Sequence, residues 1–246
     1  MSLLDIYLKL IKNTLKKLKI IMSYKTDYLL FQKEITERKI EYLIHFTPTI
    51  NLYSILESKA IMSRAKLENL DIEQFDILDY IKFSDNIRYD DKNYINLSIS
   101  APNTFLFSKF QDNSKDNPEI NWCVLKISTK YIYNNSTLFS VVNAASYSAK
   151  KQFGISKNFD GFKNIFMEEV AYNNRYFSRI KSNLQDKYPT DIQAEVLVKD
   201  KILSDDIIEV CFKNEEDLAQ AKAAMNEFNT NNFIIDNKIF NPKREK

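Results

Sequence analysis

The sequence has very little of what the commonest cofactor sites require. Only two glycines, Gly154 and Gly161, occur in 246 residues, which excludes a P-loop and a glycine-rich dinucleotide-binding turn. His45 is the one histidine, and the two cysteines, Cys123 and Cys211, are far apart and lack metal-ligand spacing. We therefore expect no metal site, no disulfide framework and a reducing, cytoplasmic environment.

A strong net charge is also missing. The 35 Lys and Arg residues nearly balance the 33 Asp and Glu residues, which gives a formal net charge of +2. This excludes the global basic field that favours duplex DNA, but it leaves room for a local groove that binds a single strand. No apolar run is long enough for a membrane span and no signal-peptide cleavage site is present, so we expect neither segment. The composition, 44% hydrophobic and 28% charged, is typical of a globular chain.

Residues 1–22 have the pattern of an amphipathic helix. Apolar side chains form one seam with heptad-like spacing, at Leu4, Leu8, Ile11, Leu15, Leu18 and Met22. Because an isolated helix of this length is marginal in water, the seam must be covered. The chain's own body, a protein partner and a membrane surface are all open as its cover. We expect a helical extension over residues 1–40 and one main domain over residues 41–246.

Hydrophobic periodicity predicts the elements of the main domain. Strands are expected over 41–48, 94–100, 122–127, 138–142, 191–198 and 207–212. Helices are expected over 24–41, 51–57, 159–170 and 215–228, the second of them capped by Thr49. His45 stands near the end of the first strand, just before the capped helix, where it is either structural or turned toward a cleft.

The strand over 191–198 carries two polar residues on one face. Gln193 and Glu195 are two positions apart, so their side chains point to the same side of the sheet. Two interpretations are open at this point. Either the face is exposed and Glu195 is an ordinary surface acid, or the carboxylate is buried and has a partner or a task that offsets the cost of burial.

Two groups of cations also have two interpretations each. Arg88 lies among acids in the loop 81–91, where it forms a surface ion pair or clamps a phosphate. Arg175, Arg179 and Lys181 alternate with aromatic residues, a pattern that suits unstacked nucleobases and equally suits an amphipathic helix.

Several separated segments together resemble one family. They are 43–57, LIHFTPTINLYSILE; 85–90, DNIRYD, with 97–103, LSISAPN; 193–198, QAEVLV; and, more loosely, 143–146, NAAS. In this order they resemble the DarT-type nucleic-acid ADP-ribosyltransferases over about residues 42–212. The first 40 residues and the C-terminal helix lie outside the resemblance.

The resemblance implies an α+β fold, the ADP-ribosyltransferase split β-sheet with flanking helices, with NAD in the cleft between the sheet halves. It implies that Glu195 is the catalytic glutamate and Arg88 the essential arginine. The residues expected around NAD are His45, Phe46, Thr47, Asn51, Ser98 and Gln193. The residues expected around the acceptor are Asn143, Lys150, Lys151 and Arg175, with Lys157 and Arg179 as further candidates. Beyond residue 145 the segment departs from the family's pattern, which leaves the acceptor open.

The chemistry agrees with these residue types. Breaking the nicotinamide–ribose bond develops positive charge on the ribose, which a fixed carboxylate such as Glu195 stabilises without a metal. The expected function is transfer of ADP-ribose from NAD to a nucleobase of single-stranded DNA or RNA, by a toxin or phage-defence effector. An antitoxin or chaperone-type partner would then bind through residues 1–22. A protein-directed transferase and an inactive module that only binds NAD are the alternatives.

Overall fold

The computed structural model describes residues 23–70, 91–115, 117 and 120–245. The helix expected over 1–22 and the candidate Arg88 lie outside these residues. The described helices are α2 Tyr28–Glu37, α3 Asn51–Glu57, α4 Arg64–Leu70, α5 Thr104–Asn113, α6 Phe159–Asn164 and α7 Glu215–Ala224. The described strands are β1 Leu43–Pro48, β2 Ala60–Met62, β3 Tyr94–Ile99, β4 Trp122–Ile127, β5 Leu138–Ser140, β6 Ile155–Ser156, β7 Glu169–Tyr172, β8 Arg175–Ser178, β9 Glu195–Lys199, β10 Lys201–Leu203, β11 Ile207–Phe212 and β12 Phe233–Ile235.

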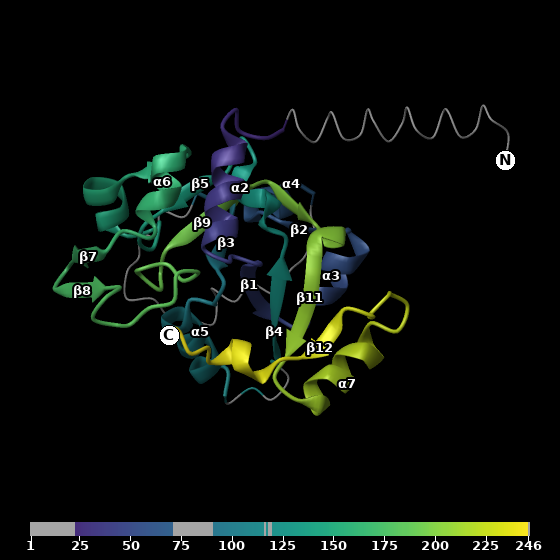
Figure 1. The fold of residues 1–246 in the computed structure, drawn as a ribbon. Coiled ribbons are helices and arrows are strands. Elements are labelled where there is room, and N and C mark those ends of the chain that lie inside the picture. The colour runs from purple at the N-terminus through teal and green to yellow at the C-terminus, as the bar shows by residue number, and fades with distance from the viewer. Residues whose placement is uncertain (1–22, 71–90, 116, 118–119, 246) are drawn as a thin grey trace, which may run out of the picture.

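One mixed sheet organises the chain, in the order β12-β11-β4-β1-β3-β9-β5-β6 (Figure 1). Its two halves meet where β1 lies against β3, and this joint is short. Strand β1 pairs with β4 along its whole length, from Leu43 to Pro48, but with β3 only at Leu43 and Ile44. Strand β3 then pairs with β9 through its other end. The predicted split β-sheet with flanking helices is confirmed.

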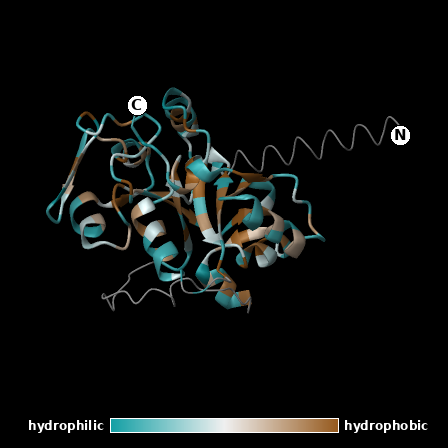
Figure 2. Ribbon diagram, turned by 90° about the horizontal axis from the view of Figure 1, so that it is seen from below, coloured by the Kyte–Doolittle hydropathy of each residue, from teal (hydrophilic) through white to brown (hydrophobic). Residues whose placement is uncertain are grey.

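Both faces of the sheet are covered by helices because its strands carry apolar side chains on both sides. In β4, Cys123 and Leu125 join the larger cluster, and Trp122 and Val124 join a second one. Helices α2, α3, α6 and α7 contribute to the larger cluster, whereas α5 and the 3-10 turn Asn237–Phe240 cover the second. Figure 2 shows this arrangement, with hydrophobic residues concentrated on the strands and hydrophilic ones on the outer surfaces of the helices.

The segment before α2 is anchored by a buried lysine. The amine of Lys25 donates to the carbonyl oxygens of Asn134 at 2.8 Å and Thr137 at 2.7 Å. Burial lowers the pKa of Lys25 to about 8. The two carbonyl oxygens replace water as hydrogen-bond acceptors for its amine. Phe31 and Ile35 of α2 extend into the larger core cluster. The domain boundary between residues 40 and 41 stays a prediction.

Several predicted elements have different bounds. The strand expected from Asp191 begins at Glu195, because residues 191–194 form a turn in which the Ala194 amide donates to the Asp191 carbonyl at 3.2 Å. The helix expected over 159–170 ends at Asn164. Thr49 does not cap α3, whose first flanking residue is Ile50 without a side-chain cap.

The segment with alternating cations and aromatic residues is a β-hairpin, so the interpretation as an amphipathic helix is wrong. Strands β7 and β8 pair from Glu169↔Ser178 to Tyr172↔Arg175. The two residues between them, Asn173 and Asn174, both have positive φ, 46° and 60°. Asparagine tolerates this left-handed conformation, and two such residues form the tight turn that matches the twist of a hairpin.

Candidate active site

The opening between β1 and β3 places His45 beside Asn96. Past the pair Ile44↔Ser98 the two strands no longer pair, and the Nδ1 atom of His45 lies 3.3 Å from the carbonyl oxygen of Asn96. A carbonyl oxygen only accepts, so Nδ1 carries the proton of this hydrogen bond. The neutral ring therefore keeps Nε2 as an acceptor.

Glu195 is buried at the start of β9, with only 7% of its surface exposed. Its Oε1 atom accepts from the Asn96 side-chain amide at 3.1 Å, and its Oε2 atom accepts from the backbone N–H of Ala144 at 2.7 Å. Hydrogen bonds to an ionised group are worth about 1.5–3 kcal/mol each, which offsets part of the desolvation cost. The interpretation of Glu195 as a surface acid is therefore wrong.

Asn96 joins the two halves of this site. Its backbone carbonyl accepts from His45 and its side chain donates to Glu195, so one residue of β3 fixes an imidazole on one side and a carboxylate on the other. Asn96 is not among the site residues that the sequence predicts. The signal was present in the strand pattern, where Asn96 and Ser98 share the polar face of an otherwise apolar β3.

The other residues expected around NAD divide into two groups. Thr47 and Asn51 are buried together, and the Asn51 amide donates to the Thr47 hydroxyl at 3.0 Å. Ser98 is buried on β3, and Gln193 is buried in the turn before β9. The ring of Phe46, however, stacks on Phe107 at 4.5 Å between ring centroids. Phe46 therefore packs against the second core cluster.

Asp191 holds the turn that leads to Glu195, a role that the sequence does not predict because its period-two pattern places Asp191 in a strand. It is fully buried. Its carboxylate accepts from the Tyr172 hydroxyl at 2.6 Å and from the Gln193 backbone N–H at 2.8 Å. Burial raises the pKa of Asp191, and burial together with this carboxylate raises the pKa of Tyr172. The turn before Glu195 is thus attached to the hairpin β7–β8.

The residues expected around the acceptor lie on two neighbouring segments. The Asn143 side chain accepts from the Ala145 backbone N–H at 3.0 Å, and this turn presents the Ala144 N–H to Glu195. Lys150 and Lys151 are exposed on the π-helical turn Ala149–Phe153, and the Gln152 amide at its end donates to the Ala171 carbonyl of the hairpin at 2.8 Å.

Arg175 and Arg179 differ in what their guanidinium groups do. Arg175 is exposed at the tip of the hairpin, with its guanidinium carbon 5.0 Å from the ring centroid of Phe105. Arg179 instead donates to the carbonyl oxygens of Tyr188 at 2.7 Å and Gln185 at 3.0 Å. Arg179 therefore holds the loop before Asp191, and it is not part of an open basic groove. Lys157 is exposed.

The chemistry available to this arrangement follows from its charge. A buried carboxylate with fixed geometry stabilises positive charge that develops beside it and accepts hydrogen bonds from hydroxyl groups. Within the described ranges, no group of three or more His, Cys, Asp or Glu side chains could hold a metal ion. Among the same residues, no helix is long and apolar enough to cross a membrane.

We predict that His45 titrates below the ordinary histidine value of 6.5, because burial lowers its pKa. Its proton then binds more readily to the unfolded chain, so the free energy of unfolding falls as pH falls below 6.5. The chain has one histidine, so a long-range ¹H–¹⁵N spectrum reports its titration and tautomer without assignment. His45→Gln removes this part of the pH dependence of stability. A midpoint at or above 6.5 would contradict the prediction.

Comparison with known proteins identifies the family. Residues 44–240 match the family model described as "ssDNA thymidine ADP-ribosyltransferase, DarT". DarTG from Thermosipho africanus in complex with ADP-ribose has a similar fold, with a TM-score of 0.56 and 21% identity over 81% of this chain. This chain spans 51% of that DarTG chain.

DarT from Thermus sp. 2.9 is similar as well. Its complex with ADP-ribosylated ssDNA gives a TM-score of 0.55 and 11% identity, covering 82% of this chain and 96% of that chain. Its complex with carba-NAD⁺ gives a TM-score of 0.53 and 11% identity, covering 80% of this chain and 96% of that chain. At these identities the likeness establishes the fold alone. No curated protein matches the sequence.

The family model covers most of the chain, including β1, β3 and β9 with His45, Asn96 and Glu195. This confirms the family that the motifs predicted. The chain belongs to the DarT family of single-stranded DNA thymidine ADP-ribosyltransferases.

Proposed function

We propose that this chain transfers ADP-ribose from NAD to a thymidine base of single-stranded DNA. The sequence left DNA and RNA open, and the description of the matching family favours DNA and thymidine. The observation that carries the proposal is the buried Glu195 carboxylate, fixed by Asn96 and Ala144 at the opening of the split sheet. That opening is where the resemblance places NAD.

Glu195 has two tasks in this reaction. As the bond between nicotinamide and C1′ of the ribose breaks, the carboxylate stabilises the positive charge on the ribose and accepts from its hydroxyls. The acceptor base then forms a bond to C1′ from the other side. In thymidine the ring nitrogen that carries a proton is N3, and Glu195 takes that proton as N3 attacks. Nicotinamide leaves with the electrons of the broken bond.

The remaining residues around the opening bind and orient NAD. His45, as a neutral ring, offers Nε2 to a ribose hydroxyl, and the Thr47–Asn51 pair supplies polar groups further along β1. Ser98 lies two residues after Asn96, and Gln193 lies two residues before Glu195. We assign Arg88 to the pyrophosphate, whose charge and geometry match a guanidinium group.

The acceptor strand lies against the segment that holds Glu195. Asn143 shapes the turn whose Ala144 N–H donates to the carboxylate, and the exposed Lys150, Lys151 and Arg175 supply positive charge for the phosphates. A single strand is favoured because a base inside a duplex has to be flipped out before N3 is accessible, at a cost of a few kcal/mol.

The biological role that we propose is a cytoplasmic toxin or phage-defence effector. The name DarTG, for the similar Thermosipho africanus protein of which this chain spans 51%, is in line with a second component in such systems. A modifying enzyme that attacks DNA needs restraint, and we propose an antitoxin-type protein partner that binds residues 1–22.

We predict that Glu195→Gln lowers the rate of ADP-ribosyl transfer by about 100-fold or more. The amide keeps the size of the side chain but removes the negative charge that stabilises the ribose cation. The substitution therefore destabilises the transition state and not the complex with NAD. NAD should still raise the unfolding temperature of the variant by mass action. Glu57→Gln, at an exposed position at the end of α3, is the matched control. Equal rates for Glu195→Gln and the parent protein would reject Glu195 as the catalytic group.

The acceptor is tested with matched oligonucleotides and labelled NAD. We expect label on a single strand that contains one thymidine, little label on its duplex, and none on the same strand without thymidine. RNA of the corresponding sequence and a cell lysate serve as the other acceptors. Label on protein alone would overturn the acceptor while leaving the NAD chemistry in place.

Deletion of residues 1–22 tests the proposed partner. We expect the truncated protein to keep its thermal stabilisation by NAD and its transfer activity, and to lose affinity for the partner that co-purifies with the full chain. An insoluble product, or one that no longer binds NAD, would show that these residues belong to the domain core.

A further inference from the structure

Phe105 stands out on α5 because it is the aromatic residue of that helix that does not enter the core. It is 43% exposed, whereas Phe107 is 1% and Phe110 3% exposed. The second core cluster includes Phe107 and Phe110, and Phe105 belongs to none of the described clusters. Packing of α5 is thus complete without this ring, which leaves part of the ring accessible at the surface.

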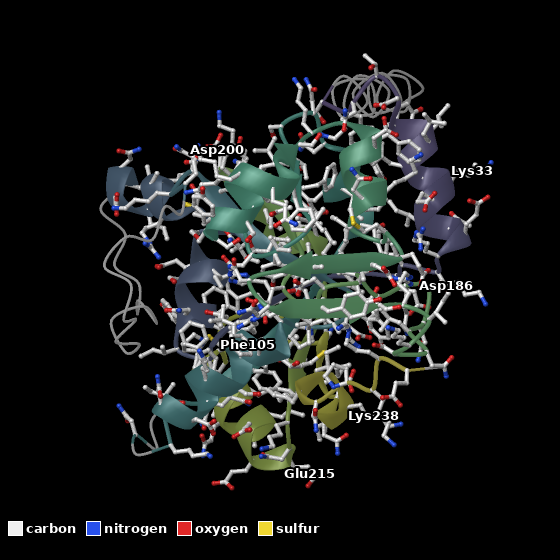
Figure 3. The ribbon with its side chains drawn as sticks, turned by 90° about the vertical axis from the view of Figure 1, so that its left-hand side faces the viewer. Lys33, Phe105, Asp186, Asp200, Glu215 and Lys238 are labelled. Carbon is white, nitrogen blue, oxygen red and sulfur yellow. The ribbon has the colours of Figure 1, made fainter. Side chains whose placement is uncertain are left out.

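Two cations converge on the Phe105 ring. The Lys109 amine lies 4.5 Å and the Arg175 guanidinium carbon 5.0 Å from the ring centroid, within cation–π range. Lys109 is one helical turn along α5, but Arg175 comes from the tip of the hairpin β7–β8. Figure 3 shows Phe105 on α5 just beside the two strands of this hairpin. Among the described residues, neither cation forms an ion pair with a carboxylate.

The same patch is attached to both sides of the candidate active site. Arg175 is the register partner of Tyr172, whose hydroxyl donates to Asp191, and Asp191 in turn accepts from the Gln193 backbone N–H. Gln193 is two residues from Glu195. On the other side, α5 directly follows β3, and its cap Asn103 accepts from the Leu106 N–H at 3.1 Å.

We propose that Phe105, Lys109 and Arg175 bind a nucleotide that neighbours the target thymidine. This inference rests on the proposed function. The base of that nucleotide stacks on the Phe105 ring in place of a cation that lies over it in the free protein, and the two cations then contact the adjoining phosphates. An exposed aromatic ring flanked by two cations matches an unstacked base with its phosphate. The connection through Tyr172 and Asp191 links this patch to the segment that leads to Glu195, where the acceptor DNA is expected. Because every base has a stacking face, the patch selects a single strand and not a sequence.

The stacking contact is tested by an abasic scan. Oligonucleotides with one thymidine carry an abasic site at each flanking position in turn, and their affinity is measured by fluorescence anisotropy without NAD. Phe105→Leu should weaken binding of the intact strand about 10-fold, the loss expected for one stacked base. At one flanking position the abasic site should weaken oligonucleotide binding by the parent protein by the same factor. At that position it should leave binding by the Phe105→Leu variant unchanged. Phe105→Trp should restore affinity.

Two controls separate this patch from general effects. Tyr53→Leu removes another exposed aromatic ring, 40% exposed on α3, and should leave oligonucleotide affinity unchanged. Lys109→Ala should reduce the dependence of log K on log salt by about 0.7, the value for one phosphate contact on a single strand. Lys115→Ala is the matched control and should leave this salt dependence unchanged. Lys115 lies just beyond the C-terminal end of α5, where its amine pairs with Asp112 at 2.6 Å.

The outcomes distinguish this inference from the proposed function. If the parent protein modifies thymidine in single-stranded DNA but Phe105→Leu responds to every abasic site as the parent does, the stacking role is wrong and the proposed function stands. If Phe105→Leu loses thermal stabilisation by NAD, the ring belongs to the NAD site and the DNA role is wrong. If the parent protein neither binds nor modifies the oligonucleotides, both are wrong.

Discussion

The pair of hydrogen bonds that hold the Glu195 carboxylate is the interaction on which the rest of this site depends. A buried charge is tolerated only when fixed donors replace the water that it has lost. Here one donor comes from β3 and the other from the turn after β5, so the carboxylate exists in this position only if the sheet and that turn are both correctly placed. Orientation of Glu195 is therefore a property of the whole fold.

The short joint between β1 and β3 is the counterpart of this constraint. A continuous ladder would satisfy every backbone group of the two strands and leave no opening. Because the ladder ends after Ile44, His45 satisfies the Asn96 carbonyl with a side chain, and the sheet keeps an open edge in its middle without an unsatisfied carbonyl there. The end of the ladder thus explains both the break in the sheet and the position of the His45 side chain at the Asn96 carbonyl.

Side chains away from Glu195 fix the segments that lead to it. Asp191 fixes the turn before β9, Tyr172 ties that turn to the hairpin, and Arg179 holds the preceding loop through the Gln185 and Tyr188 carbonyls. The two arginines of this segment therefore differ in role: Arg179, just after β8, is structural, and Arg175 lies at the tip of the hairpin, facing Phe105.

The sequence by itself predicted the family, the main strands along the chain, and His45 and Glu195 as candidate site residues, because motifs and period-two alternation are local properties of the chain. The tertiary structure alone decided that Glu195 is buried, that Asn96 joins it to His45, and that Asp191 ends a turn and does not begin a strand. It also decided that 169–178 is a hairpin, a choice between two periods that so short a segment leaves open. The fixed position of Glu195 and its link to His45 through Asn96 depend on partners that are distant in sequence, and no local pattern records which distant groups the sheet brings within hydrogen-bonding reach.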